Sequence, residues 1–450
     1  MRTDLRLARL LVSGSDRREW WRIALTAFGA LLATGFALVA VVLTALRGHH
    51  SLGFAHGLLD QPGERQGAVL TLLLLLVPVF GFLGQCARIG AVHRDRRLAG
   101  LRLAGATPRQ VRRIAAAEAG LACLAGSAVA TVFSVLLLVT NWSVPSGWAW
   151  AGIAVVAAGV PVVGAAVSVL ALRRVVASPL GLVRRVRPQP RPGLMFLLAV
   201  ALFAGASVLS YLTLSSRGTH RGVALGPLLV FSLLVVIGTA ALWLVGATAR
   251  LTGRLLAART ERPAVLIAAE RLRDDPWAAA RGHAAVLLVT IVATAFVGVR
   301  QVLLEILASD KHLGESRGFY TAGIDLTAAA IGVALLITLF GLAVGTAESL
   351  AGRRRGLAAQ TAAGVPRAVL GRALLLQTAL PLAPAVLLAG LGGMLVGTGY
   401  AALTDDGGSR SVPWVALLVP VAVYAACLLA AATSLPLLRR SAHPGELRYA

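Results

Sequence analysis

Lysine is almost missing from this chain: its single lysine is Lys311, although lysine and arginine together number 43. A Walker A loop needs a lysine at the nucleotide phosphates. Lys311 stands in a short connection, residues 309–321, between two long apolar runs. The chain therefore lacks the residue with which it would hydrolyse ATP itself.

Charged residues and cysteines are also scarce. Only 14% of the residues are charged, against about a quarter in soluble domains. The three cysteines have no CxxC spacing, which predicts small buried residues rather than a disulfide framework or a metal site. His49, His50 and His56 cluster in one connection, and a solvated surface is favoured there over a weak metal site.

Long polar segments are absent as well, while 57% of the residues are hydrophobic. The apolar runs approach the ~20 residues that a helix needs to cross a bilayer. The sequence therefore predicts an all-α, polytopic membrane protein with about ten transmembrane helices. The expected spans are 23–46, 67–88, 114–140, 149–172, 194–213, 224–248, 283–308, 322–347, 369–400 and 413–437.

The arginines lie in alternate connections between these spans. The net charge of +24 is therefore spread over many short loops, which indicates membrane orientation and not nucleic-acid binding. The positive-inside rule places both termini in the cytoplasm. The bias toward arginine and alanine favours a bacterial protein of the plasma membrane. The lead 1–22, with Trp20 and Trp21, suits an amphipathic helix lying on the cytoplasmic leaflet.

Two basic connections are similar in order and spacing. Residues 94–113 read RDRRLAGLRLAGATPRQVRR, and residues 353–372 read RRRGLAAQTAAGVPRAVLGR. In the first, Gly105 is expected to end a short amphipathic helix in a left-handed conformation, Thr107 to cap the next helix, and Pro108 to suit its first turn. The order of basic run, apolar turn, glycine and Pro-Arg returns near Gly364, which indicates duplication of a transmembrane unit.

The first connection, followed by Glu118 and Gly126 in a long helix, resembles the FtsX-like (MacB-type) permease domain of ABC transporters. The resemblance implies two FtsX-like units joined by two extra helices, as in the single-chain permeases of peptide-antibiotic resistance transporters. Those carry a large extracellular domain between spans seven and eight, where this chain has only residues 309–321. The second copy departs further from the pattern, since Gln377 stands near the position that matches Glu118.

In that family the basic connection docks on a cytoplasmic ATPase. The resemblance therefore implies an ATPase-coupling role for thirteen residues of the two copies: Arg97, Leu98, Leu101, Arg102, Leu103, Gly105, Pro108, Arg109, Arg355, Leu357, Gly364, Pro366 and Arg367. Basic loops that merely fix orientation are the alternative. Glu118 is expected to pair with Arg112 or Arg113.

The expected division follows the spans. An N-terminal helix covers 1–22, a first permease unit 23–172, a linker with spans five and six 173–282, a second permease unit 283–437, and a cytoplasmic tail 438–450. In span nine, Pro381 and Pro384 predict a kink, and Gly393 with Gly397 has the G-x-x-x-G spacing of close helix packing.

Charges inside spans are costly and usually face protein or water. Arg300 and Glu305 in span seven and Asp325 at the start of span eight are the clear examples. A structural set of interfacial charges is favoured, and a substrate path or gate is the alternative.

The sequence thus favours a permease that exports or extracts an amphiphile, such as a peptide antibiotic, a lipid or a lipopeptide. Two cytoplasmic ABC ATPase subunits would hydrolyse ATP with Mg²⁺, and the chain itself would be no enzyme and bind no cofactor. A secondary transporter would want ionisable groups or broken helices near the midplane, and few are seen. A polytopic lipid-glycan enzyme would want carboxylates on a sizeable outward loop, and the sequence has no such loop.

Overall fold

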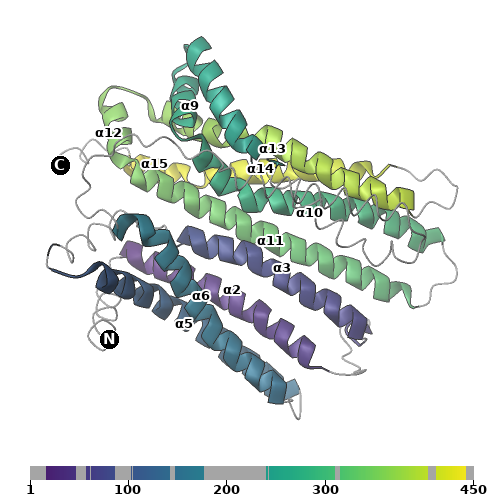
Figure 1. Cartoon of the computed structure of the whole chain (residues 1–450). Helices are drawn as coiled ribbons and strands as arrows, with labels where there is room; N and C mark the ends of the chain where they lie inside the picture. Colours follow the sequence, from purple (N-terminus) through teal and green to yellow (C-terminus); the bar gives the residue numbers. More distant parts are fainter. Residues whose placement is uncertain are drawn as a thin grey trace, which may run out of the picture. The chain divides into compact units, whose positions relative to one another are not determined.

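The computed structural model describes residues 17–46, 57–60, 62–86, 103, 105–141, 147–176, 240–241, 243–309, 315–403 and 412–441. In this part of the chain all regular structure is helical (Figure 1). Eight of the helices are long and apolar enough to cross a membrane. They correspond to eight of the expected spans, so the chain is an all-α polytopic membrane protein. The expected span 194–213 lies outside the described residues, and of 224–248 a short C-terminal stretch is described, continuing as a helix to residue 259.

Contacts divide the chain into two compact units. The first unit comprises Met1–Arg185 and Glu315–Gly352, and the second comprises Val186–Gly314 and Arg353–Ala450. This differs from the expected division, because the eighth expected span belongs with the first four. Its position follows from packing and not from chain order.

The first unit contains five long helices, of which α2 (Arg17–Ala45) contacts α3 (Pro62–Cys86), α5 (Pro108–Asn141) and α6 (Gly147–Val176). Figure 1 shows α11 (Arg317–Gly352) lying along α3. The rings of Phe82 and Phe340 meet there with centroids 5.7 Å apart. Gly341 lies beside the same ring, and a Cβ on it would be in ordinary contact with Phe82 at 3.7 Å.

A small residue brings the backbones of α2 and α5 together. A Cβ placed on Gly126 would lie 1.9 Å from the carbonyl oxygen of Ala27. Buried side chains fill the surrounding core: Ala30, Ala33, Val79, Phe82, Leu83, Cys86, Cys123, Val160 and Ile337. The burial of Cys86 and Cys123 agrees with their expected role as small core residues, as does that of Cys427 in the second unit.

In the second unit α10 (Pro276–Ser309) packs along α13 (Arg367–Leu403). A Cβ on Gly393 would lie 2.6 Å from the carbonyl oxygen of Ile291, and one on Gly397 would lie 3.0 Å from the Cα of Gly298. The two glycines of the G-x-x-x-G spacing thus do allow the close approach that the sequence predicts.

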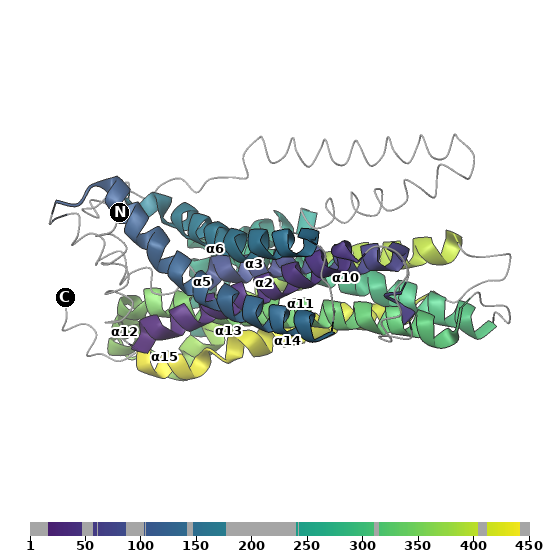
Figure 2. The ribbon, with the colours of Figure 1, turned by 90° about the horizontal axis from the view of Figure 1, so that it is seen from below.

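Shorter elements complete the second unit. α9 (Pro263–Asp274) precedes α10, and α12 (Arg354–Ala362) precedes α13. The 3-10 helix η2 (Trp414–Leu417) leads into α14 (Leu418–Ala432), and α15 (Leu435–Ser441) follows. Figure 2 shows α15 near α12, in agreement with their contacts. α13 is continuous through Pro381 and Pro384.

Side chains of neighbouring helices reach the backbone around these two prolines. The Tyr424 hydroxyl donates to the carbonyl oxygen of Ala379 at 3.3 Å, and the Thr248 hydroxyl donates to that of Pro381 at 3.4 Å. Proline lacks an N–H and therefore leaves carbonyl oxygens of the preceding turn without a helical donor. The missing donors would have bonded the carbonyl oxygens of Gln377 and Leu380, so the bonds to Ala379 and Pro381 hold neighbouring helices against α13 without replacing the lost ones.

The start of α2 corrects one expectation. The helix begins at Arg17 and runs without a break into the apolar span, so residues 17–22 are not part of a separate surface helix. Trp20 and Trp21 are 54% and 65% exposed, but Arg22 is buried. Residues 1–16 lie outside the described part of the chain.

Candidate coupling segments

The first candidate segment enters α5 through a capping box. The backbone N–H of Gln110 donates to the Thr107 hydroxyl at 3.3 Å, and the Gln110 side-chain oxygen accepts from the Thr107 N–H at 2.8 Å. Such a reciprocal pair satisfies two donors that a helix N-terminus otherwise leaves free. Pro108 occupies the first helical position, where its missing N–H costs nothing. Both predicted roles are confirmed.

The residues before this cap present an exposed surface. Gly105 has φ +95°, the left-handed conformation that the sequence predicts for it. Leu103 is 75% exposed, and Arg109 is exposed on the first turn of α5. Four members of the expected set lie outside the described residues: Arg97, Leu98, Leu101 and Arg102.

A buried ion pair lies on α5 beyond the capping box. Glu118, 2% exposed, pairs with Arg22 of α2, 7% exposed. The sequence predicts a partner for Glu118 in its own helix, Arg112 or Arg113, and Arg22 belongs to the segment expected as a surface lead. The position of Arg22 immediately before an apolar run could have indicated a buried ion pair. Since α2 begins at Arg17, Arg22 lies within the helix, where a buried arginine needs a partner. The pair joins α2 to the helix that continues the first segment.

The second candidate segment, α12, ends in a Schellman motif. The N–H of Val365 donates to the carbonyl oxygen of Gln360, and the N–H of Gly364 donates to that of Thr361, both at 3.0 Å. Gly364 has φ +90°, so it adopts the same left-handed conformation as Gly105. Pro366 follows, and α13 begins at Arg367. The two segments therefore share the break that joins them to the next long helix, as their sequences predict.

One expectation for this second segment is wrong. Leu357, offered as a docking contact, is 1% exposed and packs inside the second unit together with the fully buried Ala358. The exposed face of α12 instead carries Gly356 and Ala359, beside Arg353. Arg355 lies on α12, and its side chain is outside the described part. The spacing between leucine and arginine in α12 resembles that in the first segment. Which side of α12 is buried depends instead on how the helix packs against the rest of the second unit.

Gly364 allows a clean test of the helix end. A Cβ at Gly364 would meet no atom within 4 Å. Gly364→Ala is therefore expected to lower the free energy of unfolding by about 1–2 kcal/mol, which is the penalty for alanine in the left-handed conformation. Gly356→Ala, within α12 and equally free of contacts, is expected to raise stability slightly, because alanine favours a helix over glycine. Thermal unfolding of the purified protein in detergent measures both. Equal shifts in the two variants would contradict the helix-end role of Gly364.

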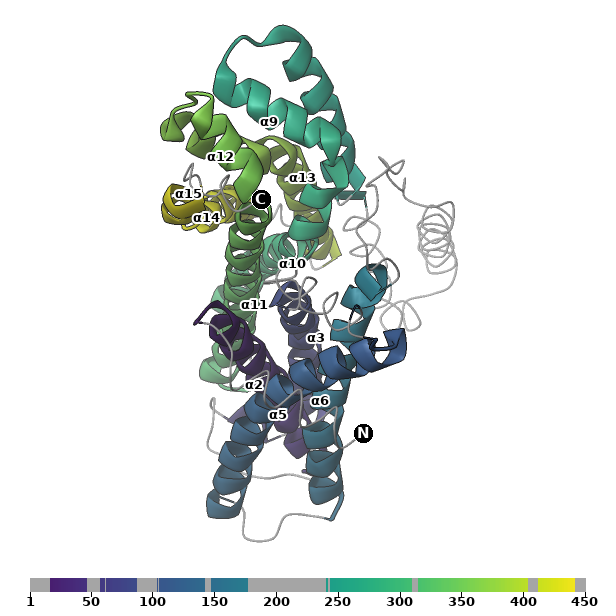
Figure 3. The same ribbon diagram turned by 90° about the vertical axis from the view of Figure 1, so that its left-hand side faces the viewer.

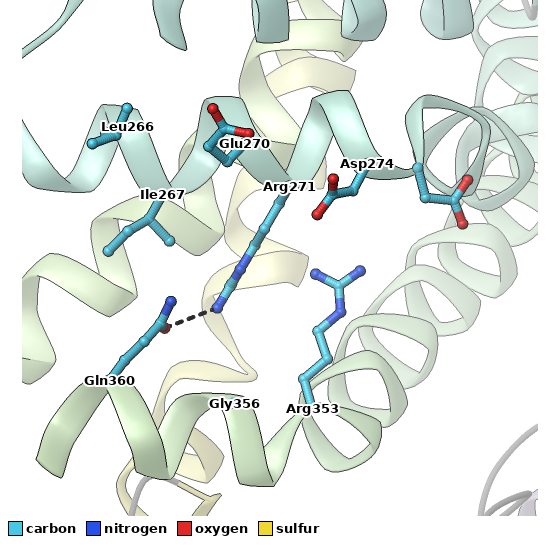
Figure 4. A pocket seen from close by; sticks show the side chains of 9 residues that line it. Leu266, Ile267, Glu270, Arg271, Asp274, Arg353, Gly356 and Gln360 are labelled. Atoms are coloured by element: carbon cyan, nitrogen blue, oxygen red, sulfur yellow. Dashed lines mark hydrogen bonds between the residues drawn. The ribbon is translucent and has the colours of Figure 1, made fainter. Parts of the chain in front are cut away.

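A pocket of about 640 Å³ is lined by residues of α9 and of the start of α12. Figure 3 shows these two helices near one another. Nine residues line it: Leu266, Ile267, Glu270, Arg271, Asp274, Asp275, Arg353, Gly356 and Gln360. Figure 4 shows the Arg271 and Arg353 side chains entering the same space, with Arg271 directed toward Gln360. The Arg271 guanidinium donates to the Gln360 side-chain oxygen at 3.3 Å. Burial and the neighbouring charge of Arg353 lower the pKa of Arg271 from its ordinary value to about 10. This group cannot be recognised in the sequence, because α9 and α12 are far apart in the chain.

The expected charges of spans seven and eight do not form one described site. Arg300 and Glu305 lie on α10, where Glu305 is exposed and accepts from the Gln301 side chain at 3.4 Å. Asp325 is exposed on α11, which belongs to the other compact unit. Within the described residues there is no group of three or more His, Cys, Asp or Glu that could hold a metal ion, and His49, His50 and His56 lie outside them.

Comparison with known proteins adds one finding. No curated protein and no solved structure matches the chain. Residues 68–180 match the model of the FtsX-like permease C-terminal family. The matched range holds most of α3, the first candidate segment, and the helices α5 and α6. This family consists of transporter components and not of catalytic enzymes. The match includes Glu118 and the Thr107 cap, and it shows that this part of the chain is similar to the FtsX-like permease family.

Proposed function

We propose that this chain is the permease subunit of an ABC transporter of the MacB type. Two cytoplasmic ATPase subunits would hydrolyse ATP with Mg²⁺, and the permease would use that energy to export or extract an amphiphile from the bacterial plasma membrane. Peptide antibiotics, lipids and lipopeptides are the proposed substrates. Both termini would lie in the cytoplasm, and about ten helices would cross the membrane.

The observation that carries this proposal is the match of residues 68–180 together with the break repeated at Gly105 and Gly364. At each position a left-handed glycine stands three residues before the start of a long apolar helix, and a proline is either its first residue (Pro108) or the residue before it (Pro366). A rigid connection of this kind would transmit a displacement of the segment to the long helix that follows it. The buried Arg22–Glu118 pair extends this connection in the first unit, because it ties α5 to α2.

The two segments would contact their ATPases differently. The first presents Leu103, 75% exposed, and Arg109. The second presents small residues of α12, because Leu357 is buried. ATPase docking on the first segment would therefore depend on an exposed apolar side chain. Docking on the second would depend on close approach of the ATPase to a helix face that carries small residues.

Affinity purification of the tagged full-length chain from native membranes tests the proposal. We expect an ABC ATPase to be recovered, with two copies per permease chain by native mass spectrometry. Leu103→Asp is expected to lower its recovery about tenfold, because burying a leucine is worth roughly 1.5–3 kcal/mol. The matched control is Val412→Asp, at a residue 62% exposed and outside both segments. Normal ATPase recovery with Leu103→Asp would contradict the coupling role of this segment, and recovery of no ATPase would contradict the proposed function.

A further inference from the structure

The pocket between α9 and α12 combines two kinds of charge with an apolar rim. Arg271 enters it from α9 and Arg353 from the start of α12 (Figure 4). In the described part of the chain neither arginine forms an ion pair with a carboxylate. Arg271 is held by Gln360, which is neutral. Two guanidinium groups thus lie in the same pocket, and neither is paired with a carboxylate of the described residues.

The proximity of the two arginines is unfavourable in the empty pocket. The charge of Arg353 contributes to lowering the pKa of Arg271 to about 10. A pKa of about 10 keeps Arg271 protonated near neutral pH, so the repulsion persists there. An anion placed between them would remove the repulsion and accept charge-assisted hydrogen bonds from both guanidinium groups. Arginine is well suited to bind the oxygens of a phosphate in this way.

Carboxylates on α9 decide what kind of anion fits. Glu270, Asp274 and Asp275 line the same pocket and are exposed. Glu270 is engaged with Arg273 at 3.4 Å, whereas Figure 4 shows Asp274 on the side of the pocket that Arg353 enters. These three carboxylates would repel a ligand that carries negative charge alone. A ligand with a phosphate and an amine would match both sets of charges.

The apolar rim and the position of the pocket point to a lipid. Leu266 and Ile267 line it beside the charged groups, and Leu266 is 38% exposed. α10 begins at Pro276, and its candidate membrane span begins at His283. Seven residues of helix rise about 10 Å. The polar headgroup layer on each side of the hydrocarbon is roughly 5–7 Å thick. The near end of the pocket therefore lies about 3–5 Å beyond the headgroup layer, within reach of a headgroup that extends out of it.

We propose that the α9–α12 pocket binds the headgroup of a zwitterionic phospholipid that carries a primary amine. Its phosphate lies between Arg271 and Arg353, its ammonium group faces Asp274, and the start of an acyl chain lies along Leu266 and Ile267. The bound lipid bridges α9 to α12 and so ties the element before α10 to the element before α13. Gly356 and Arg353 belong both to this pocket and to the face of α12 proposed to meet an ATPase, so binding is tested on the chain alone.

Native mass spectrometry of the full-length chain in detergent tests the site, with phosphatidylethanolamine and phosphatidylglycerol added in parallel. We expect phosphatidylethanolamine to be retained preferentially. Arg353→Gln is expected to weaken its retention about tenfold, as for the loss of a hydrogen bond to a charged group. Arg262→Gln is the matched control, because Arg262 directly precedes α9, is exposed and does not line the pocket. Equal retention by Arg353→Gln and Arg262→Gln would overturn the proposal.

Asp274→Asn separates the two halves of the headgroup. We expect it to reduce retention of phosphatidylethanolamine while leaving or raising that of phosphatidylglycerol. Thermal shifts with inorganic phosphate and with glycerophosphoethanolamine distinguish a soluble ligand from a lipid. Stronger protection by inorganic phosphate than by either phospholipid, or preferential retention of phosphatidylglycerol by the unmodified chain, would overturn the zwitterionic lipid assignment.

Discussion

Replacing Glu118 with leucine is expected to destabilise the first unit by about 3–5 kcal/mol, since Arg22 would keep its charge in a buried position without this carboxylate. Arg22 and Glu118 are 7% and 2% exposed, so water replaces little of the lost attraction. The double variant Arg22→Met/Glu118→Leu removes both charges and is expected to recover most of the loss. Thermal unfolding of the purified chain in detergent measures the series.

A surface ion pair provides the control for this series. Arg273 and Glu270 are also paired, at 3.4 Å, but their side chains are 58% and 48% exposed. Exposed pairs contribute roughly 0–1 kcal/mol, so Glu270→Leu is expected to change the unfolding temperature little. If Glu118→Leu and the double variant were equally stable, the ion pair would not hold α2 to α5, and the coupling path proposed through it would lose its physical basis.

Gly126→Ala is expected to have the second large effect. Its Cβ would lie 1.9 Å from the Ala27 carbonyl oxygen and 3.0 Å from the Leu31 nitrogen, both backbone atoms of α2. A backbone cannot rotate away as a side chain can, so the two helices must separate. Overpacking of a core costs about 1–3 kcal/mol and occasionally more, and we expect the upper end of this range. Fluorescence-detected size exclusion after heating would show the loss.

The matched control lies in the same unit. A Cβ on Gly81 of α3 would meet no atom within 4 Å, so Gly81→Ala is expected to leave stability unchanged or slightly higher. The second unit offers a parallel pair on one helix: Gly393→Ala, whose Cβ would lie 2.6 Å from the Ile291 carbonyl oxygen, and Gly399→Ala, which has free space. Tolerance of Gly126→Ala at the level of Gly81→Ala would show that α2 and α5 are not in close backbone contact.

The local features of the two segments could be predicted because they depend on neighbouring residues. Thr107 and Gln110 form the cap that their spacing predicts, and Gly105 and Gly364 both have positive φ. Helix caps and left-handed glycines depend on residues three to five positions apart. The membrane spans were predictable for a related reason, since a bilayer requires a continuous apolar run of sufficient length.

Tertiary structure decided what depends on residues far apart in the chain. It paired Glu118 with Arg22, buried Leu357, placed α11 beside α3, and brought Arg271 to Arg353 across a pocket. Each outcome depends on which helix faces become neighbours, and lipid-facing and protein-facing sides of an apolar helix look alike in sequence. Thus the order of helices and their caps could be read along the chain. The Arg22–Glu118 pair and the pocket arise only from packing, because the groups that form them lie on helices far apart in the sequence.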